Sequence, residues 1–313
     1  NKANDNVAVG YSAMEANTTA AQNTAVGKDA MKANTTGATN TAIGYNSLDT
    51  NTTGSTNVAV GAHALQANTT AADNVAVGVS ALAANTTGTN NTAVGRAALS
   101  TNSTASGNTA VGQTALQLNT TGAENTAVGK GAMVANTTGT RNIAIGANAY
   151  DASDTENDNI AIGYQAMTTN TAGGTKNIAL GNYAMDALTS ADNCIGIGYA
   201  ALGATTTGVD NTAVGTKTLL DNTTGAYNAA FGTDSMKDNT TGDFNTAIGR
   251  AALQFNTTAD GNTAIGRNAL YANTTGASNV AVGALALDAN TTAAYNVAVG
   301  SEALGANTTG ASN

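Results

Sequence analysis

Residues 23–39 read NTAVGKDAMKANTTGAT, and this stretch returns with small changes every 17 residues along the chain. Only the copy at 159–176 is longer, with 18 residues. A fixed short period over a whole chain indicates one small structural unit stacked on itself, without a globular domain built from distant contacts. We therefore treat 1–313 as a single repeat array of 18 copies, which begin at residues 6, 23, 40, 57, 74, 91, 108, 125, 142, 159, 177, 194, 211, 228, 245, 262, 279 and 296.

Numbered from its Asn, the repeat has the consensus Asn-Thr/Val-Ala-Val/Ile-Gly-x-x-Ala-Leu/Met-x-Ala-Asn-Thr-Thr-Gly-x-x. Gly and Asn-Thr-Thr-Gly interrupt the apolar residues too often for a helix, which needs about 10 residues or more. β-branched residues at positions 2 and 4 alternate with Ala at position 3, which is typical of a strand. The repeat thus predicts an all-β fold, a parallel β-solenoid (β-roll) of 18 coils. Each coil is expected to hold a strand at positions 2–4, a turn at Gly 5, an extended segment near 8–11 and a polar turn at 12–15.

The strand alternation also predicts the interior of the coil. Positions 2 and 4 point to one side and position 3 to the other. Because position 4 is apolar in every copy, we expect that side to be the interior, with Leu or Met at position 9 as the opposite wall. The Ala at position 3 then faces outward. A uniformly small outward column favours close packing of several chains, in a homotrimer or a filament.

Two further columns of the repeat have structural interpretations. Gly at position 5 predicts a turn with positive φ or a backbone too crowded for a Cβ atom. Asn at position 1 predicts a ladder of side-chain hydrogen bonds between coils, and Asn at position 12 (Asn17, Asn34, Asn51) predicts a second ladder at the opposite turn. The turn glycines include Gly10, Gly27, Gly44, Gly61, Gly78 and Gly95, and the first ladder includes Asn6, Asn23, Asn40, Asn57, Asn74, Asn91, Asn108 and Asn125.

Composition argues against several kinds of partner. The net charge is −9, with only 11 basic residues and no basic stripe, so nucleic-acid binding is not indicated. No apolar run approaches the roughly 20 residues that span a bilayer, so we expect no membrane insertion. Pro is absent, as expected where every strand is paired. Because the chain starts and ends within a repeat, we expect it to be part of a longer protein.

The residues that carry chemistry are few and scattered. His63 is the only His and lies at variable position 7, so neither a catalytic triad nor a metal site can be assembled around it. Cys194 replaces the Asn of position 1, and we expect a buried, inert thiol. No glycine motif for dinucleotides follows a strand. We therefore predict no catalytic residue, no cofactor and no metal. The Asn-Thr-Thr turns match the N-glycosylation acceptor.

Residues 142–210 depart from the pattern. Position 2 becomes Ile, the Asn-Thr-Thr-Gly turn is replaced at 153–156 and 188–191, and the 18-residue copy lies here. One interpretation is drift of the repeat with better packed coils. The other is a lateral contact or receptor patch, in which irregular turns and Tyr side chains provide specificity. The candidate patch consists of Tyr150, Tyr164, Tyr183 and Tyr199.

The run Asn-Thr-Ala-Val-Gly-x-x-Ala-Leu followed by Asn-Thr-Thr-Gly, over residues 6–313, resembles the head repeats of trimeric autotransporter adhesins. It is also similar to repeats in tail-fibre proteins of marine phages and in bacterial surface proteins that carry a tail-fibre chaperone domain. The resemblance implies a left-handed parallel β-roll, three of which associate side by side. This chain departs from the adhesin repeat in having about three more residues and the Asn-Thr-Thr-Gly turn.

These observations lead to the expectation of a non-enzymatic extracellular fibre, on a bacterial surface or a virion, that attaches to surfaces or host cells. A cell-surface glycan or receptor is the partner that the resemblance implies. A purely structural self-assembling filament or surface-layer component is the alternative. A more remote alternative is ice binding, since Thr columns are able to order water, although we expect these columns at a turn and not on a strand face.

Overall fold

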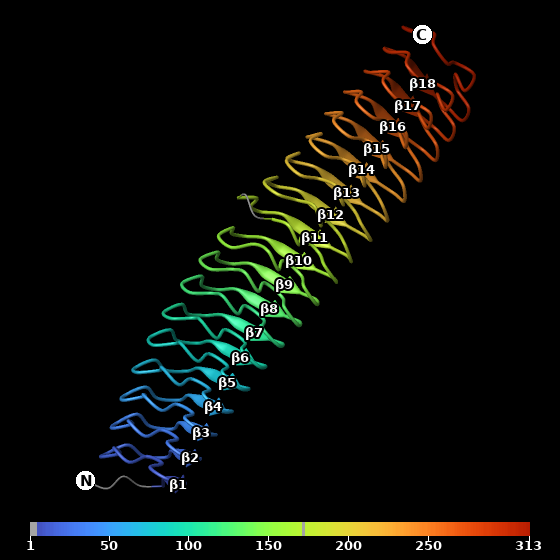
Figure 1. Cartoon of the computed structure of the whole chain (residues 1–313). Coiled ribbons are helices and arrows are strands. Elements are labelled where there is room, and N and C mark those ends of the chain that lie inside the picture. The colour runs from blue at the N-terminus through green and yellow to red at the C-terminus, as the bar shows by residue number, and fades with distance from the viewer. Residues whose placement is uncertain (1–4, 171–172) are drawn as a thin grey trace. The chain divides into compact units, whose positions relative to one another are not determined.

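The computed structural model describes residues 5–170 and 173–313 and divides into two units, residues 5–157 and 158–313. Within each unit the chain winds in successive coils, and each coil contributes one three-residue strand (Figure 1). The strands run parallel, and no helix occurs among the described residues. The predicted all-β parallel β-solenoid with a period of about 17 residues is therefore confirmed.

The strands occupy positions 2–4 of the repeat, as the alternation of β-branched residues and Ala predicts. The first unit contains β1 (Val7–Val9), β2 (Thr24–Val26), β3 (Thr41–Ile43), β4 (Val58–Val60), β5 (Val75–Val77), β6 (Thr92–Val94), β7 (Thr109–Val111), β8 (Thr126–Val128) and β9 (Ile143–Ile145). The second unit contains β10 (Ile160–Ile162), β11 (Ile178–Leu180), β12 (Ile195–Ile197), β13 (Thr212–Val214), β14 (Ala229–Phe231), β15 (Thr246–Ile248), β16 (Thr263–Ile265), β17 (Val280–Val282) and β18 (Val297–Val299).

Neighbouring strands within a unit pair at equal repeat positions. In β4 and β5, for example, Val58 lies opposite Val75 and Ala59 lies opposite Ala76. The longer copy at 159–176 keeps this register, since Ile160 pairs with Ile178. Every repeat position therefore forms a straight column of side chains, spaced by about 4.8 Å in the hydrogen-bonding direction.

The return path of the coil differs from the prediction. We expected an extended segment near positions 8–11, but these residues form turns and no strand. Positions 7, 9 and 17 adopt left-handed backbone, as at His63 (φ 60°), Leu65 (φ 49°) and Asp73 (φ 60°). Each of their N–H groups donates to a carbonyl of an adjacent coil, at 2.9, 3.1 and 3.2 Å respectively. These bonds offset the roughly 1–2 kcal/mol that left-handed backbone costs an L-residue.

The prediction of the interior was wrong for the strand. Ala at position 3, such as Ala59 and Ala76, is fully buried, whereas positions 2 and 4 face outward. The physical reason is the period of two: position 1 lies on the same side as position 3, and the buried Asn of position 1 places Ala inside with it. The outward Ala column therefore does not exist, and the argument for chain association that we built on it fails.

Small side chains are required at position 3 because the opposite wall is close. At Gly196, which replaces this Ala, an added Cβ atom would lie 3.0 Å from Cε of Met185 and 3.2 Å from the carbonyl oxygen of Ala201. Met185 occupies position 9 and Ala201 position 8, both fully buried. The interior is thus one layer of Leu or Met that packs directly against alanines. The expectation that position 9 lies inside is confirmed, and the one that position 4 lies inside is wrong.

Candidate functional site

The Asn column at position 1 connects each coil to the next. The Asn91 backbone N–H donates to Oδ1 of Asn74 at 3.0 Å, and Nδ2 of Asn91 donates to the Ala105 carbonyl at 2.9 Å. The same bonds recur along both units, and Asn23, Asn40, Asn57, Asn74, Asn91, Asn108 and Asn125 are fully buried, while Asn6 in the first coil is half-buried. Since a buried amide without partners is costly, these side chains serve the fold and are not accessible to a ligand.

The Asn column at position 12 lies beside the first column and not at the opposite turn, as we had expected. Nδ2 of Asn68 donates to Oδ1 of Asn51 at 2.8 Å and to the Ala71 carbonyl at 3.1 Å. The same carbonyl accepts Nδ2 of Asn57, from position 1, at 2.9 Å. The two Asn columns therefore converge on one carbonyl, because the chain reverses between them and closes the coil there.

This arrangement also bears on the Asn-Thr-Thr sequences. The acceptor Asn of the matches in the inner coils, such as Asn51 or Asn68, is fully buried and its amide hydrogens are engaged in the ladder, while Asn17 and Asn307 in the first and last coils are half-buried. A glycan on that nitrogen has no room in the folded coil. The matches to the glycosylation signal are therefore explained by the turn that the three residues build.

The glycines at position 5 combine a positive φ with a backbone too crowded for a Cβ atom, which were expected as alternatives. Gly27, Gly44, Gly61, Gly78 and Gly95 have φ between 135° and 140°, and Gly10 has φ 134°. An added Cβ atom at any of these six would lie within 2.4–2.6 Å of backbone atoms of the next coil. The coils therefore stack with backbone against backbone at this corner.

Residues 142–210 are where the second Asn column is interrupted. Three of the four copies in this segment have another residue in place of the Asn at position 12, namely Ser153, Leu188 and Thr205. At the first of these, Glu156 turns its carboxylate inward and accepts hydrogen bonds from Oγ of Ser153 at 2.7 Å and from the Asp154 N–H at 3.1 Å. The hydroxyl of Thr205 is buried without a partner. The irregular turns at 153–156 and 188–191 thus coincide with substitutions within the ladder.

Thr205→Asn is expected to raise the free energy of unfolding by about 1 kcal/mol, because it replaces a buried unpaired hydroxyl with the amide that other coils use. Its Oδ1 would accept Nδ2 of Asn222, which now bonds only the Gly225 carbonyl. Thr207→Asn, two residues away on an exposed site, is the control, with an expected change within about 0.5 kcal/mol. Urea denaturation of both variants measures the difference, and equal changes would contradict the ladder argument.

Cys194 takes the place of an Asn in the first column. Its backbone N–H donates to Oδ1 of Asn177 at 2.9 Å, and its thiol donates to the Gly208 carbonyl at 3.2 Å, as an Asn amide does in other coils. Burial raises the pKa of the Cys194 thiol to about 11. A neutral, buried thiol is a poor nucleophile.

The four tyrosines of the candidate patch do not share one environment. Tyr150 is fully buried, because it stands at position 9 in the core column of Leu and Met, and its assignment to a surface patch was wrong. Tyr164, Tyr183 and Tyr199 lie on successive coils with ring centroids 5.5 and 5.9 Å apart, in edge contacts. Tyr164 and Tyr199 are 43% and 49% exposed. These three tyrosines form a surface cluster, and the position of Tyr150 in the repeat was the signal that separates it from them.

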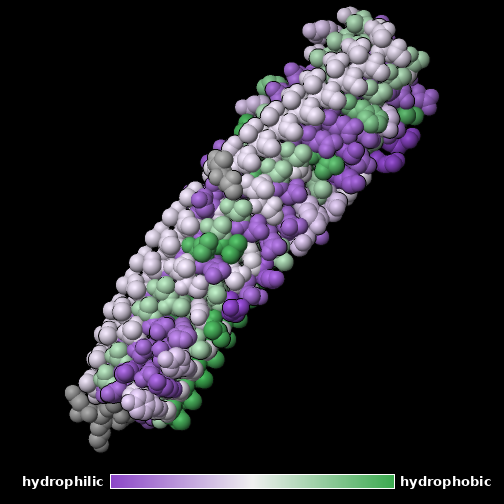
Figure 2. All heavy atoms as spheres, in the orientation of Figure 1, coloured by the Kyte–Doolittle hydropathy of each residue, from purple (hydrophilic) through white to green (hydrophobic). Residues whose placement is uncertain are grey.

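The outward strand face is the surface that sequence analysis missed. It consists of positions 2 and 4 of successive coils, where no copy has a charged residue. Exposed members include Ile43, Ile145, Leu180, Phe231 and Ile248, each about two-fifths exposed. Figure 2 shows strongly hydrophobic residues gathered along the strand side of the first unit, and the Asn-Thr-Thr-Gly side as a pale row near neutral hydropathy. Position 4 supplies an apolar column within each unit and position 2 adds Thr, Val or Ile, and exposed apolar surface of this kind marks interaction sites.

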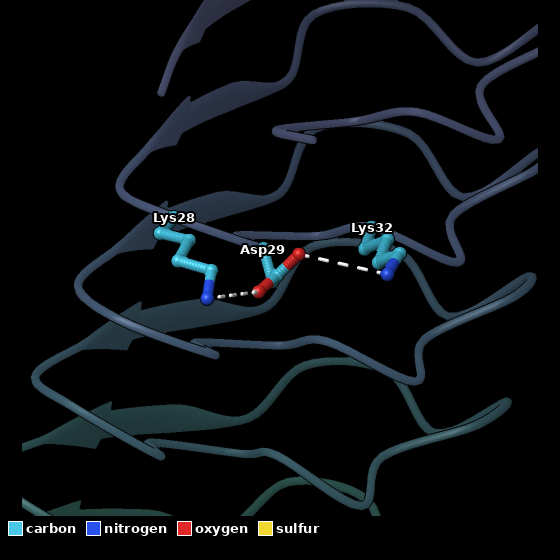
Figure 3. A network of polar contacts seen from close by, with 3 residues as sticks. All are labelled: Lys28, Asp29 and Lys32. Atoms are coloured by element: carbon cyan, nitrogen blue, oxygen red, sulfur yellow. Dashed lines mark ion pairs between the residues drawn. The ribbon is translucent and has the colours of Figure 1, made fainter. Parts of the chain in front are cut away.

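Charged side chains gather elsewhere, mainly at positions 6, 7, 10, 11, 16 and 17. Asp29 lies between Lys28 and Lys32, at 3.8 and 3.6 Å from their Nζ atoms (Figure 3). Nζ of Lys28 also lies 5.7 Å from the ring centroid of Tyr45, whose ring meets His63 edge-on at 5.2 Å. The two lysine side chains are exposed and that of Asp29 is mostly covered, so these are surface ion pairs that contribute little stability.

The described residues contain no pocket, and no group of three or more His, Cys, Asp or Glu side chains suited to a metal ion. Within the same residues, no helix is long and apolar enough to span a membrane. No protein-family model matches this chain, and no curated protein matches it.

Proposed function

We propose that this chain is part of a non-enzymatic extracellular fibre, a shaft or head that attaches to surfaces or host cells. The observation that carries the proposal is the repetition of one coil with one outward face along each unit. Hydrogen bonds run from coil to coil through the backbone and through both Asn columns, which makes each unit stiff along its stacking direction. A stiff array with a repeated surface suits a scaffold better than a reaction centre.

Association with copies of the same chain follows from the outward strand face. Two chains that each carry a net charge of −9 repel each other at neutral pH. This repulsion is weakest when they meet through a surface without charged side chains. The strand face is such a surface, and its apolar side chains gain from being covered. The resemblance to trimeric adhesin heads implies three chains in a parallel bundle, and we adopt that number here.

The tyrosine cluster of Tyr164, Tyr183 and Tyr199 is the candidate for receptor contact. Tyr164 and Tyr199 are exposed and Tyr183 between them is half-buried, and Tyr is common at sites of recognition because it has an apolar ring and a polar end. A purely structural filament would have no use for such a cluster, so glycan or cell binding by the purified protein separates these two functions.

The association is tested by light scattering on the purified chain. We expect a mass three times that of one chain. The triple variant Val60→Lys, Val77→Lys, Val94→Lys, which places three charges on the outward strand face, is expected to have the mass of a single chain. A monomeric parent protein would contradict the proposal.

The control variant carries the same charges on the same coils but off the strand face. It replaces position 10 in each coil with Lys, at Gln66, Ala83 and Ser100, which are half-buried like the three valines. We expect it to keep the mass of the parent. Circular dichroism of both variants checks that the fold is retained.

Ice binding is the second candidate. The Asn-Thr-Thr threonines lie at a turn, as expected, but a different Thr column, at position 2, lies on the outward strand face. Thr92, Thr109 and Thr126 point outward on consecutive coils, in register with the outward valines. Thermal hysteresis from a monomeric protein would favour this function over the fibre. Its absence from a stable oligomer would exclude it.

A further inference from the structure

The outward strand face is uniform except in one coil. Position 2 is Thr, Val or Ile in every copy but one, where it is Ala229, and position 4 is aliphatic in every copy but one, where it is Phe231. The two exceptions lie on the same strand, β14. The smallest residue of one column and the largest of the other thus occur together.

Neighbours within the chain do not account for this pairing. Ala229 lies between Thr212 and Thr246, and Phe231 lies between Val214 and Ile248, so both columns continue normally on either side. The Phe231 side chain remains 39% exposed. A large, partly exposed ring therefore lies beside the smallest residue of the face, and the paired strands β13 and β15 carry no matching change.

A second copy of this chain is the partner that the face fits. A partner with another repeat length would lose register after a few coils, whereas a copy matches the spacing of every column. When two copies run in the same direction with their strand faces opposed, their strands run oppositely across the contact. Position 4 of one copy then lies opposite position 2 of the other at the same level. The same contact of position 4 with position 2 joins neighbours in a three-chain bundle.

We propose that Phe231 of one chain packs against Ala229 of a neighbouring copy, and that this pair sets the register between them. Uniform columns of Thr and Val permit copies to slide by one coil with little loss of contact, as strands slip where the pattern does not specify register. A slip by one coil places Phe231 against Thr212 or Thr246, where the added volume is not accommodated. The inference rests on the self-association proposed above and adds which residues define it.

The test is cross-linking of introduced cysteines, with a short reagent that joins two thiols, between differently tagged chains that are co-expressed. All chains carry Cys194→Asn, so that the only thiols are introduced ones. One chain carries Thr246→Cys, and the other carries either Ile248→Cys, at the same level, or Ile265→Cys, one coil away. We expect the same-level pair to cross-link several-fold more than the slipped pair. Opposed sheet faces lie about 10 Å apart, so the reagent, and not a direct disulfide, spans the two thiols.

The decisive comparison repeats this in chains with Ala229→Thr and Phe231→Ile, which restore the usual residues of both columns. We expect the ratio of same-level to slipped cross-links to fall to about 1, as the columns no longer specify register. The inference is overturned if the substituted oligomer keeps its register, or if the parent oligomer already slips. Either outcome leaves the proposed association intact. Changed melting with an unchanged ratio would assign the pair to packing within one chain. A parent protein that is monomeric by light scattering overturns both proposals.

Discussion

Gly112→Ala is expected to lower the free energy of unfolding by about 4 kcal/mol or more, among the largest effects of any single substitution in this chain. Gly112 has φ 137°, a conformation that L-residues rarely adopt, and a Cβ atom would lie 2.4 Å from the carbonyl oxygen of Gly129. The three nearest atoms, in Gly129 and Lys130, all belong to the backbone, so no side chain can move aside. Urea denaturation measures the loss, and hydrogen exchange shows whether amides around this corner open first.

Gly107→Asn is the matched control, on the coil just before. Gly107 lies at position 17 with φ 73°, and the nearest atom to an added Cβ is Cγ of Glu124 at 3.6 Å. Asn90 already occupies this position one coil earlier with φ 59°. We expect a change within about 0.5 kcal/mol. If Gly112→Ala proved as mild as this control, the coils would not meet through their backbones at position 5.

Asn91→Asp is expected to lower the free energy of unfolding by about 4 kcal/mol at pH 7, because it buries a charge without a counter-ion. The new oxygen replaces Nδ2, which now donates to the Ala105 carbonyl at 2.9 Å and to Oδ1 of Asn74 at 3.2 Å. The other oxygen still accepts the Asn108 N–H. The shape is unchanged, so the loss reports the donor and the charge alone.

The effect of this substitution depends on pH in a definite direction. Burial raises the pKa of the new carboxyl in the folded state above its unfolded value of about 3.9. The folded state therefore retains the proton to higher pH, and a protonated carboxyl can donate to the Ala105 carbonyl. The deficit relative to the parent is smallest below about pH 4 and grows as pH rises through the folded pKa.

Asn90→Asp makes the same chemical change one residue earlier, on an exposed site. Aspartate already stands at this repeat position at Asp73, so the change is expected to stay within about 0.5 kcal/mol at every pH. A loss as large as that of Asn91→Asp would show that added negative charge, and not the buried ladder, is responsible.

The sequence predicts which repeat positions form columns along the coils. It does not predict for every column whether the side chains face the interior or the outside. Gly27 and Asn23 had clear interpretations, because only glycine suits that backbone and because a repeated Asn can bond to its own copies. The strand direction was inferred from hydrophobicity, which placed Val26 inside and Ala25 outside. Invariance was the better guide: Asn23 and Ala25 share one side of the strand, and both are nearly unchanged along the chain because the interior tolerates little else.

The tyrosines illustrate the same point. Tyr150 stands at position 9, where Leu and Met fill the core, and reading it by position instead of by residue type would have placed it inside. Tyr164 and Tyr199 stand at variable position 6 and are exposed. The contact geometry of the surface cluster was beyond the sequence, since it depends on how the rings of adjacent coils meet.

By itself the sequence determined the period, the parallel solenoid, the strand at positions 2–4 and the glycine turn at position 5, since these follow from local preference and repetition. The tertiary structure decided which side of the strand is interior and that both Asn columns meet at one carbonyl. Those features depend on the distance between opposite walls of the coil and on where the chain reverses. Because only small residues, Ala or once Gly, can face Leu or Met across that distance, the larger residues of the strand face outward. They form the apolar face that is available to a neighbouring chain.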